Sequence, residues 1–102
     1  MHLSTQDFER LEREVAERNE EAFDTLRRAY QGLVLKFVES KVTNPSLASE
    51  ITAQIFRSAW EKCDRYAWRD FSYHVWLIRL TNKELDDRGL IDHREEWLDR
   101  LL

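Results

Sequence analysis

The stretch Arg65–Asp70 concentrates the side chains of this sequence that are best suited to binding a flat, charged molecule. It has no helical periodicity, and we expect an exposed loop. Tyr66 and Trp68 are candidates to stack on single-stranded bases, each stack contributing about 1–3 kcal/mol. Arg65 and Arg69 would supply a positive rim. The alternative is that Trp68 packs onto the protein itself, and the residues alone leave both readings open.

Other kinds of site find little support. The three histidines are scattered and Cys63 is the only cysteine, so neither metal-ligand spacing nor an internal disulfide is present. No glycine-rich phosphate loop or nucleophile motif occurs, and we expect no cofactor and no enzymatic activity. Without a signal peptide or an apolar run of roughly 20 residues, the expected location is the cytoplasm, with no membrane partner.

The scarcity of turn-forming residues indicates the fold class. Two glycines and one proline in 102 residues favour a few long helices joined by short links over a sheet, which needs frequent turns. A hydrophobic fraction of 42% is sufficient for one packed core. We therefore predict a single all-α domain over residues 1–102, a compact bundle of four to five helices.

Apolar spacing and breaker residues place these helices. The first follows an N-cap at Ser4 or Thr5, and Gly89 is a natural stop for the fourth. The remaining segments are expected at about 20–41, 45–64, 71–88 and, as a short last helix, Asp92 to Leu101. The aromatic residues on these segments are expected mainly in the core: Phe23, Phe37, Phe56, Trp60 and Trp76.

The segment 45–64 has two distinct faces on a helical wheel. The expected core face carries Leu47, Ala48, Ile51, Ile55 and Ala59. The opposite face carries Ser46, Ser49, Glu50, Ala53 and Arg57 and is expected to contact water or a partner. On the segment 71–88, which is otherwise largely apolar, a single polar strip combines Arg79, Asn82, Lys83 and Asp86.

The charge distribution argues against a general nucleic-acid binder. The net charge is −4, whereas such proteins have a strongly basic face. Residues 62–88 carry six basic and five acidic side chains, a net of +1, and form the only basic stretch. This excludes non-specific electrostatic adhesion and leaves room for a focused patch.

Three pieces of the sequence follow one another at a characteristic spacing: Asn19–Leu26 with Leu33–Phe37, Asn44–Ile51 with Gln54–Trp60, and Asp64–Tyr66 with Phe71 and Trp76–Leu80. Together, over residues 19 to 88, they resemble region 2 of sigma factors of the extracytoplasmic-function type in the sigma-70 family. No single piece is specific, but their order and spacing are.

The resemblance implies a role in transcription initiation. In such domains the helix matching 45–64 docks on the clamp coiled coil of core RNA polymerase, which assigns docking to Ser46, Glu50, Ala53, Gln54 and Arg57. The following loop and helix bind the non-template single strand of the minus-ten promoter element and hold a flipped base. That assigns DNA binding to Arg65, Tyr66, Trp68, Arg69, Arg79, Asn82 and Lys83.

Several positions depart from the family pattern. The family's Glu-Asp pair is Ser49-Glu50 here and its Gln-Glu pair is Ala53-Gln54, so two docking carboxylates are missing. Asp86 and Asp87 replace a basic helix end, and the sequence has no counterpart of the module that reads the minus-thirty-five element. The alternative function is therefore a sigma-like interaction module that binds polymerase or an anti-sigma protein without binding promoter DNA. A structural bundle that shares only the fold remains a third reading.

Overall fold

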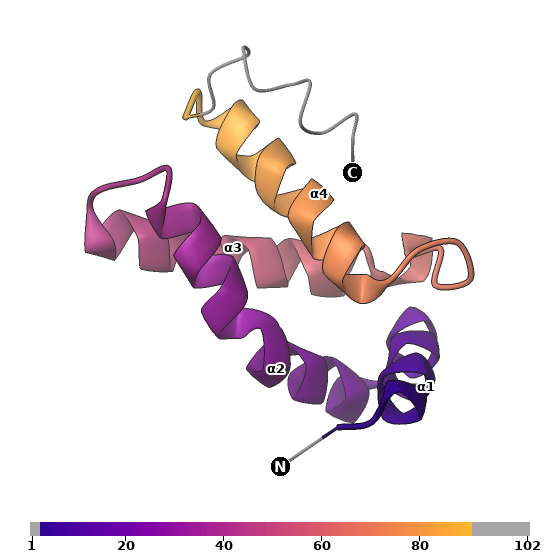
Figure 1. Cartoon of the computed structure of the whole chain (residues 1–102). Coiled ribbons are helices and arrows are strands. Elements are labelled where there is room, and N and C mark those ends of the chain that lie inside the picture. Colours follow the sequence, from indigo (N-terminus) through magenta and orange to yellow (C-terminus); the bar gives the residue numbers. More distant parts are fainter. Residues whose placement is uncertain (1–2, 91–102) are drawn as a thin grey trace.

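The computed structural model describes residues 3–90, which form an all-α bundle without strands (Figure 1). The elements are α1 (Thr5–Ala16), α2 (Glu20–Glu39), α3 (Pro45–Glu61), the short 3₁₀ helix η1 (Cys63–Arg65) and α4 (Tyr73–Asp87). The predicted fold class is confirmed. The short helix expected near Asp92 to Leu101 lies outside the described residues.

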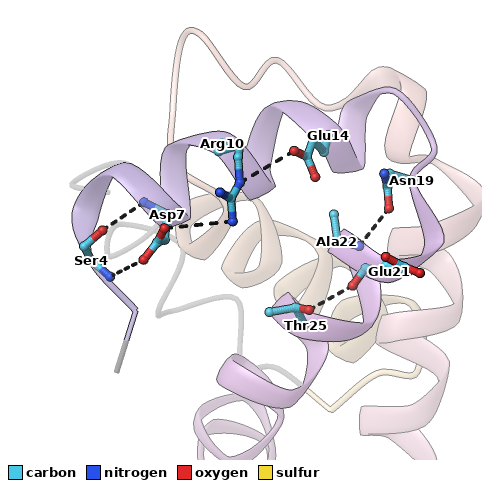
Figure 2. Close-up of polar contacts among 8 residues, drawn as sticks. All are labelled: Ser4, Asp7, Arg10, Glu14, Asn19, Glu21, Ala22 and Thr25. Carbon is cyan, nitrogen blue, oxygen red and sulfur yellow. Dashed lines mark hydrogen bonds and ion pairs between the residues drawn. The ribbon is translucent and has the colours of Figure 1, made fainter. Parts of the chain in front are cut away.

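Each α-helix begins at a polar residue that caps it. At α1, Ser4 and Asp7 form a reciprocal capping box, with the Ser4 N–H donating to Asp7 at 3.0 Å and the Asp7 N–H donating to Ser4 at 3.2 Å (Figure 2). These hydrogen bonds lower the pKa of Asp7. Asn19 caps α2 by accepting from the Ala22 N–H at 3.0 Å, and Asn44 and Ser72 cap α3 and α4 in the same way. Because these oxygens bind otherwise unpaired N–H groups, they fix where each helix starts.

The ends of α1 and α4 use the same backbone motif with different residues. Gly89 follows α4 in the left-handed conformation, with φ at 71°, and the Leu90 N–H returns to the Leu85 carbonyl at 2.8 Å. Arg18 occupies the equivalent place after α1 with φ at 64°, although it is not a glycine. The strain of this conformation is offset by side-chain contacts, because Arg18 donates to the Glu61 carbonyl at 3.2 Å and pairs with Asp64 at 3.4 Å.

Helix α2 lies at the centre of the bundle and packs against α1, α3 and α4. Its residues Leu26 and Val38 are fully buried. The two predicted faces of α3 are confirmed: Ala48, Ile51, Ile55 and Ala59 are buried and Leu47 is half-buried, whereas Ser46, Ser49, Glu50, Ala53 and Arg57 are exposed. None of the helices in residues 3–90 combines the length and the apolar character needed to cross a membrane.

The segment between α3 and α4 differs from the prediction. Helix α3 ends at Glu61 rather than near Asp64, because the chain tightens into η1, and α4 begins at Tyr73 rather than Phe71, because Ser72 is its cap. The expectation of an exposed loop over residues 65–70 is wrong for Tyr66, whose side chain is only 3% exposed. Its ring is large and apolar enough to be drawn into the core even though it lies outside a helix.

The central position of α2 makes a direct prediction about stability. Replacing the fully buried Leu26 with alanine should lower the free energy of unfolding by about 2–5 kcal/mol, since the cavity cannot be refilled. Leu33 on the same helix is 50% exposed, and Leu33→Ala should change it by less than about 0.5 kcal/mol. Urea denaturation of both variants measures this. Equal losses would contradict the burial of the Leu26 side of α2 in the core.

Candidate functional site

The outer face of α3 holds the five residues predicted to dock on a partner. Ser46, Glu50, Ala53 and Arg57 are exposed there, and Gln54 is half-buried with its amide donating to the Ser58 hydroxyl at 3.4 Å. The face therefore presents one carboxylate, one amide and one guanidinium along about two turns of helix.

A groove of about 470 Å³ runs beside this face, between α2 and α3. Its lining is mainly apolar, with Phe23 and Leu35 from α2 and Phe56 and Trp60 from α3. Ala53 and Arg57 belong both to the docking face and to the groove. A helix laid on α3 would therefore find polar contacts on the face and apolar contacts in the groove.

The loop between η1 and α4 is built on a cluster of aromatic rings. Tyr66 stacks on Trp76 with ring centres 5.0 Å apart, and it meets Phe71 and Tyr73 edge to face at 5.7 and 5.6 Å. Its hydroxyl lies 3.2 Å from the Glu12 carboxylate and 3.0 Å from the Phe71 carbonyl. Burial, with the nearby Glu12 charge, raises the pKa of Tyr66 well above its usual range. In this arrangement the Tyr66 ring is inaccessible to a base.

Two arginine side chains lie over aromatic rings of this segment, Arg69 over Trp68 and Arg79 over Phe71. The Arg69 guanidinium lies 4.9 Å from the centre of the Trp68 ring, and that of Arg79 lies 4.7 Å from the centre of Phe71. Trp68 is half-buried against the core, but it also lines a groove of about 560 Å³. Trp68 thus packs onto the bundle and also borders a groove, and its role in base stacking stays a prediction.

The predicted DNA-binding residues differ in whether their charged groups form ion pairs. No carboxylate in residues 3–90 forms an ion pair with Arg65, Arg69 or Arg79. By contrast, Lys83 pairs with Asp87 at 3.5 Å, and Asn82 is half-buried. Trp68, Arg69 and Phe71 line the same groove, and Arg79 lies over the Phe71 ring. Asn82 and Lys83 follow Arg79 by one helical turn.

Helix α1 contributes residues to this groove that the sequence did not indicate. Phe8, Glu9 and Glu12 line it opposite Trp68, and Asp70 adds a further carboxylate. Glu12 and Tyr66 are 54 positions apart, so no local pattern could have connected them. In the part of the chain that is described, no group of three or more histidine, cysteine or acidic side chains could hold a metal ion.

These features describe a helical domain with an exposed helix face and an aromatic, arginine-bearing loop. Comparison with known proteins shows a distant similarity. No protein-family model and no solved structure matches the chain. The ECF RNA polymerase sigma factors SigK of Mycobacterium sp. strains KMS and JLS are each 30% identical to it over 84 residues, as is the RNA polymerase sigma factor SigK of strain MCS.

The match covers most of this chain but only part of each relative. The aligned residues make up 82% of this chain but 44% of each relative, so the chain spans less than half the length of the curated relatives it matches. The chain is therefore distantly similar to a region of extracytoplasmic-function sigma factors. The family resemblance predicted from three sequence pieces is supported at that level.

Cys63 at the base of the loop gives a prediction about accessibility. Its side chain is fully buried, and burial raises the pKa of its thiol. At neutral pH it should react with a disulfide reagent at least about 100-fold more slowly than free cysteine, because reaction requires local opening. The rate should keep rising with pH beyond the usual titration range of a thiol. Rapid native labelling would contradict the packing beneath the loop.

Proposed function

We propose that this chain is a sigma factor region 2-like domain, a non-enzymatic module that docks on core RNA polymerase and binds the minus-ten promoter element. The observation that carries the proposal is the 30% identity over 84 residues to the SigK sigma factors. The all-helical fold, the exposed face of α3 and the aromatic loop before α4 support it. Residues 19–88 would form the sigma-like core, within one domain.

The polymerase contact is assigned to the outer face of α3. Glu50 and Gln54 offer oxygen acceptors to basic side chains of the clamp coiled coil, and Ala53 permits close approach of the two helices. Arg57 marks the edge where the apolar groove begins. With few charges on this face, polar contacts would set orientation and association rate more than affinity, and the groove would supply apolar burial.

The DNA contact is assigned to the loop and to the polar strip of α4. Trp68, held against Arg69, is the candidate stacking platform for a non-template base. Arg65, Arg79 and Lys83 are candidates for phosphate contacts, and Asn82 for a polar contact. Tyr66 would act through its position beneath the loop, since it is buried.

A second candidate function is a sigma-like module that binds polymerase or an anti-sigma protein and has no promoter activity. The observation that favours it is the acidic wall of the Trp68 groove, where Glu9, Glu12 and Asp70 would repel phosphates. A missing interaction with single-stranded DNA, combined with intact polymerase binding, would select this function.

The docking proposal is tested with a purified clamp coiled-coil fragment. Glu50→Lys and Gln54→Lys should each weaken binding about tenfold or more, because each places a cation opposite a basic surface. Glu17→Lys is the matched control, since Glu17 is exposed at the C-cap of α1 and is not part of the outer face of α3. Calorimetric titration measures the affinities. Wild-type protein that fails to bind at low salt would contradict polymerase docking.

The DNA proposal is tested by fluorescence anisotropy with single-stranded oligonucleotides that carry candidate minus-ten sequences. Trp68→Ala should cost about 1–3 kcal/mol of binding free energy, the value of one base stack. Arg79→Gln should reduce the slope of log affinity against log salt by about 0.7, as expected for one lost phosphate contact.

The control for the DNA test is Arg28→Gln. Arg28 lies on α2, where it pairs with Asp24 at 3.0 Å, and its loss should leave the salt slope unchanged. If all three variants weakened binding equally, the interaction would be non-specific, and the assignment to the loop would be wrong.

A further inference from the structure

The Tyr66 hydroxyl has one proton and two acceptors competing for it. It lies within hydrogen-bond distance of the Glu12 carboxylate and of the Phe71 carbonyl, at 3.2 and 3.0 Å. A phenol has one O–H to donate, and both a carboxylate and a carbonyl only accept. At any moment, therefore, one of the two contacts is a full hydrogen bond and the other is weakened.

The two contacts have different structural consequences. The hydrogen bond to Phe71 closes the loop on itself, because Tyr66 and Phe71 are its two ends and Ala67 to Asp70 lie between them. The backbone within the loop adds only short-range support, such as the Asp70 N–H to the Ala67 carbonyl at 2.9 Å. The hydrogen bond to Glu12 ties the loop to α1. A charged acceptor holds a proton more strongly than a neutral one, so Glu12 draws the hydroxyl away from loop closure.

We infer that Tyr66 is a positioning residue that sets the placement of Trp68 and Phe71, and that Glu12 on α1 controls how firmly it closes the loop. The positions of Arg69 and Arg79 depend on these rings in turn, because each guanidinium lies over one of them. The loop-closing role stands on the geometry alone. Its effect on a bound strand rests on the proposed function of the loop.

Two variants should change loop closure in opposite directions. Tyr66→Phe keeps the ring in the aromatic cluster but removes both hydrogen bonds, so the loop should open more often. In Glu12→Gln the amide can donate to the Tyr66 oxygen while the hydroxyl donates to the Phe71 carbonyl, which satisfies all three groups. The loop should then close more firmly. A merely structural role for Glu12 would make its substitution neutral or harmful.

Cys63 provides a readout that does not require a ligand. It is the only cysteine in the sequence, it is fully buried, and its carbonyl accepts from the Tyr66 N–H at 3.2 Å. Labelling of the folded 102-residue chain with a disulfide reagent should be about threefold to tenfold faster in Tyr66→Phe, the change in open population that one hydrogen bond makes. It should be slower than wild type in Glu12→Gln by a similar factor.

Matched controls separate this effect from general destabilisation and from charge. Tyr73→Phe removes another buried phenol from the same cluster, whose hydroxyl has no hydrogen-bond partner among the described residues, and it should not accelerate labelling. Glu9→Gln removes one negative charge from the same groove without touching Tyr66, and it should label like wild type. Denaturation of each variant shows whether labelling reports the loop or global unfolding.

The outcomes are distinct. Faster labelling in Tyr66→Phe with slower labelling in Glu12→Gln supports the competition. Unchanged labelling in Tyr66→Phe overturns it, and so does labelling of Glu12→Gln that is as fast as wild type or faster. If Tyr66→Phe does not fold, the result for Glu12→Gln decides alone.

A parallel titration uses a short single strand of mixed sequence. Glu12→Gln should bind this strand more tightly than Glu9→Gln does, and equal binding overturns the effect of loop closure on a bound strand. If wild type does not bind, the promoter-binding proposal fails while the labelling result still stands.

Discussion

The packing of α1, α3 and α4 against α2 is the constraint on which the rest of the structure depends. Leu26 and Val38 are fully enclosed, so α1, α3 and α4 must each give their apolar sides to the same central helix. This packing also determines which parts of the chain stay on the surface. Helix α3 presents Glu50 and Arg57 to solvent, and the segment that leads from α3 to α4 must cross the end of the bundle. Both candidate surfaces are consequences of one packing arrangement.

The turn between α1 and α2 links that core to the loop. Arg18 adopts a left-handed conformation that is costly for a residue with a side chain, by about 1–2 kcal/mol. Its guanidinium reaches the Glu61 carbonyl and the Asp64 carboxylate, where α3 gives way to η1, and lies 6.0 Å from the centre of the Trp60 ring. Together with the contact of Glu12 with Tyr66, this holds α1 against the segment that precedes α4. A strained turn persists here because several contacts require it.

The sequence predicted those features that local patterns encode. An N-cap at Ser4 or Thr5, the stop at Gly89, the two faces of α3 and the polar strip of α4 all follow from residue type and helical spacing. The structure confirms them, with Ser4 as the cap. The sequence could not predict the burial of Tyr66, because a ring between two helices can turn inward or outward and only the tertiary packing decides. Nor could the sequence predict that α1 contacts the loop, since Glu12 and Tyr66 are 54 positions apart. The functional roles of the site residues stay predictions.

The charges around the loop limit how a nucleic acid could bind there. Arg69 and Arg79 are not ion-paired within the described residues, but Glu9, Glu12 and Asp70 line the same groove as Arg69. A phosphate approaching Arg69 would also meet these carboxylates, so the electrostatic gain would be small and easily screened by salt. Stacking does not depend on net charge, and a base can stack on Trp68 only after it has left a duplex. Under the proposed promoter-binding function, this groove would therefore bind opened DNA through its bases and would have little affinity for double-stranded DNA.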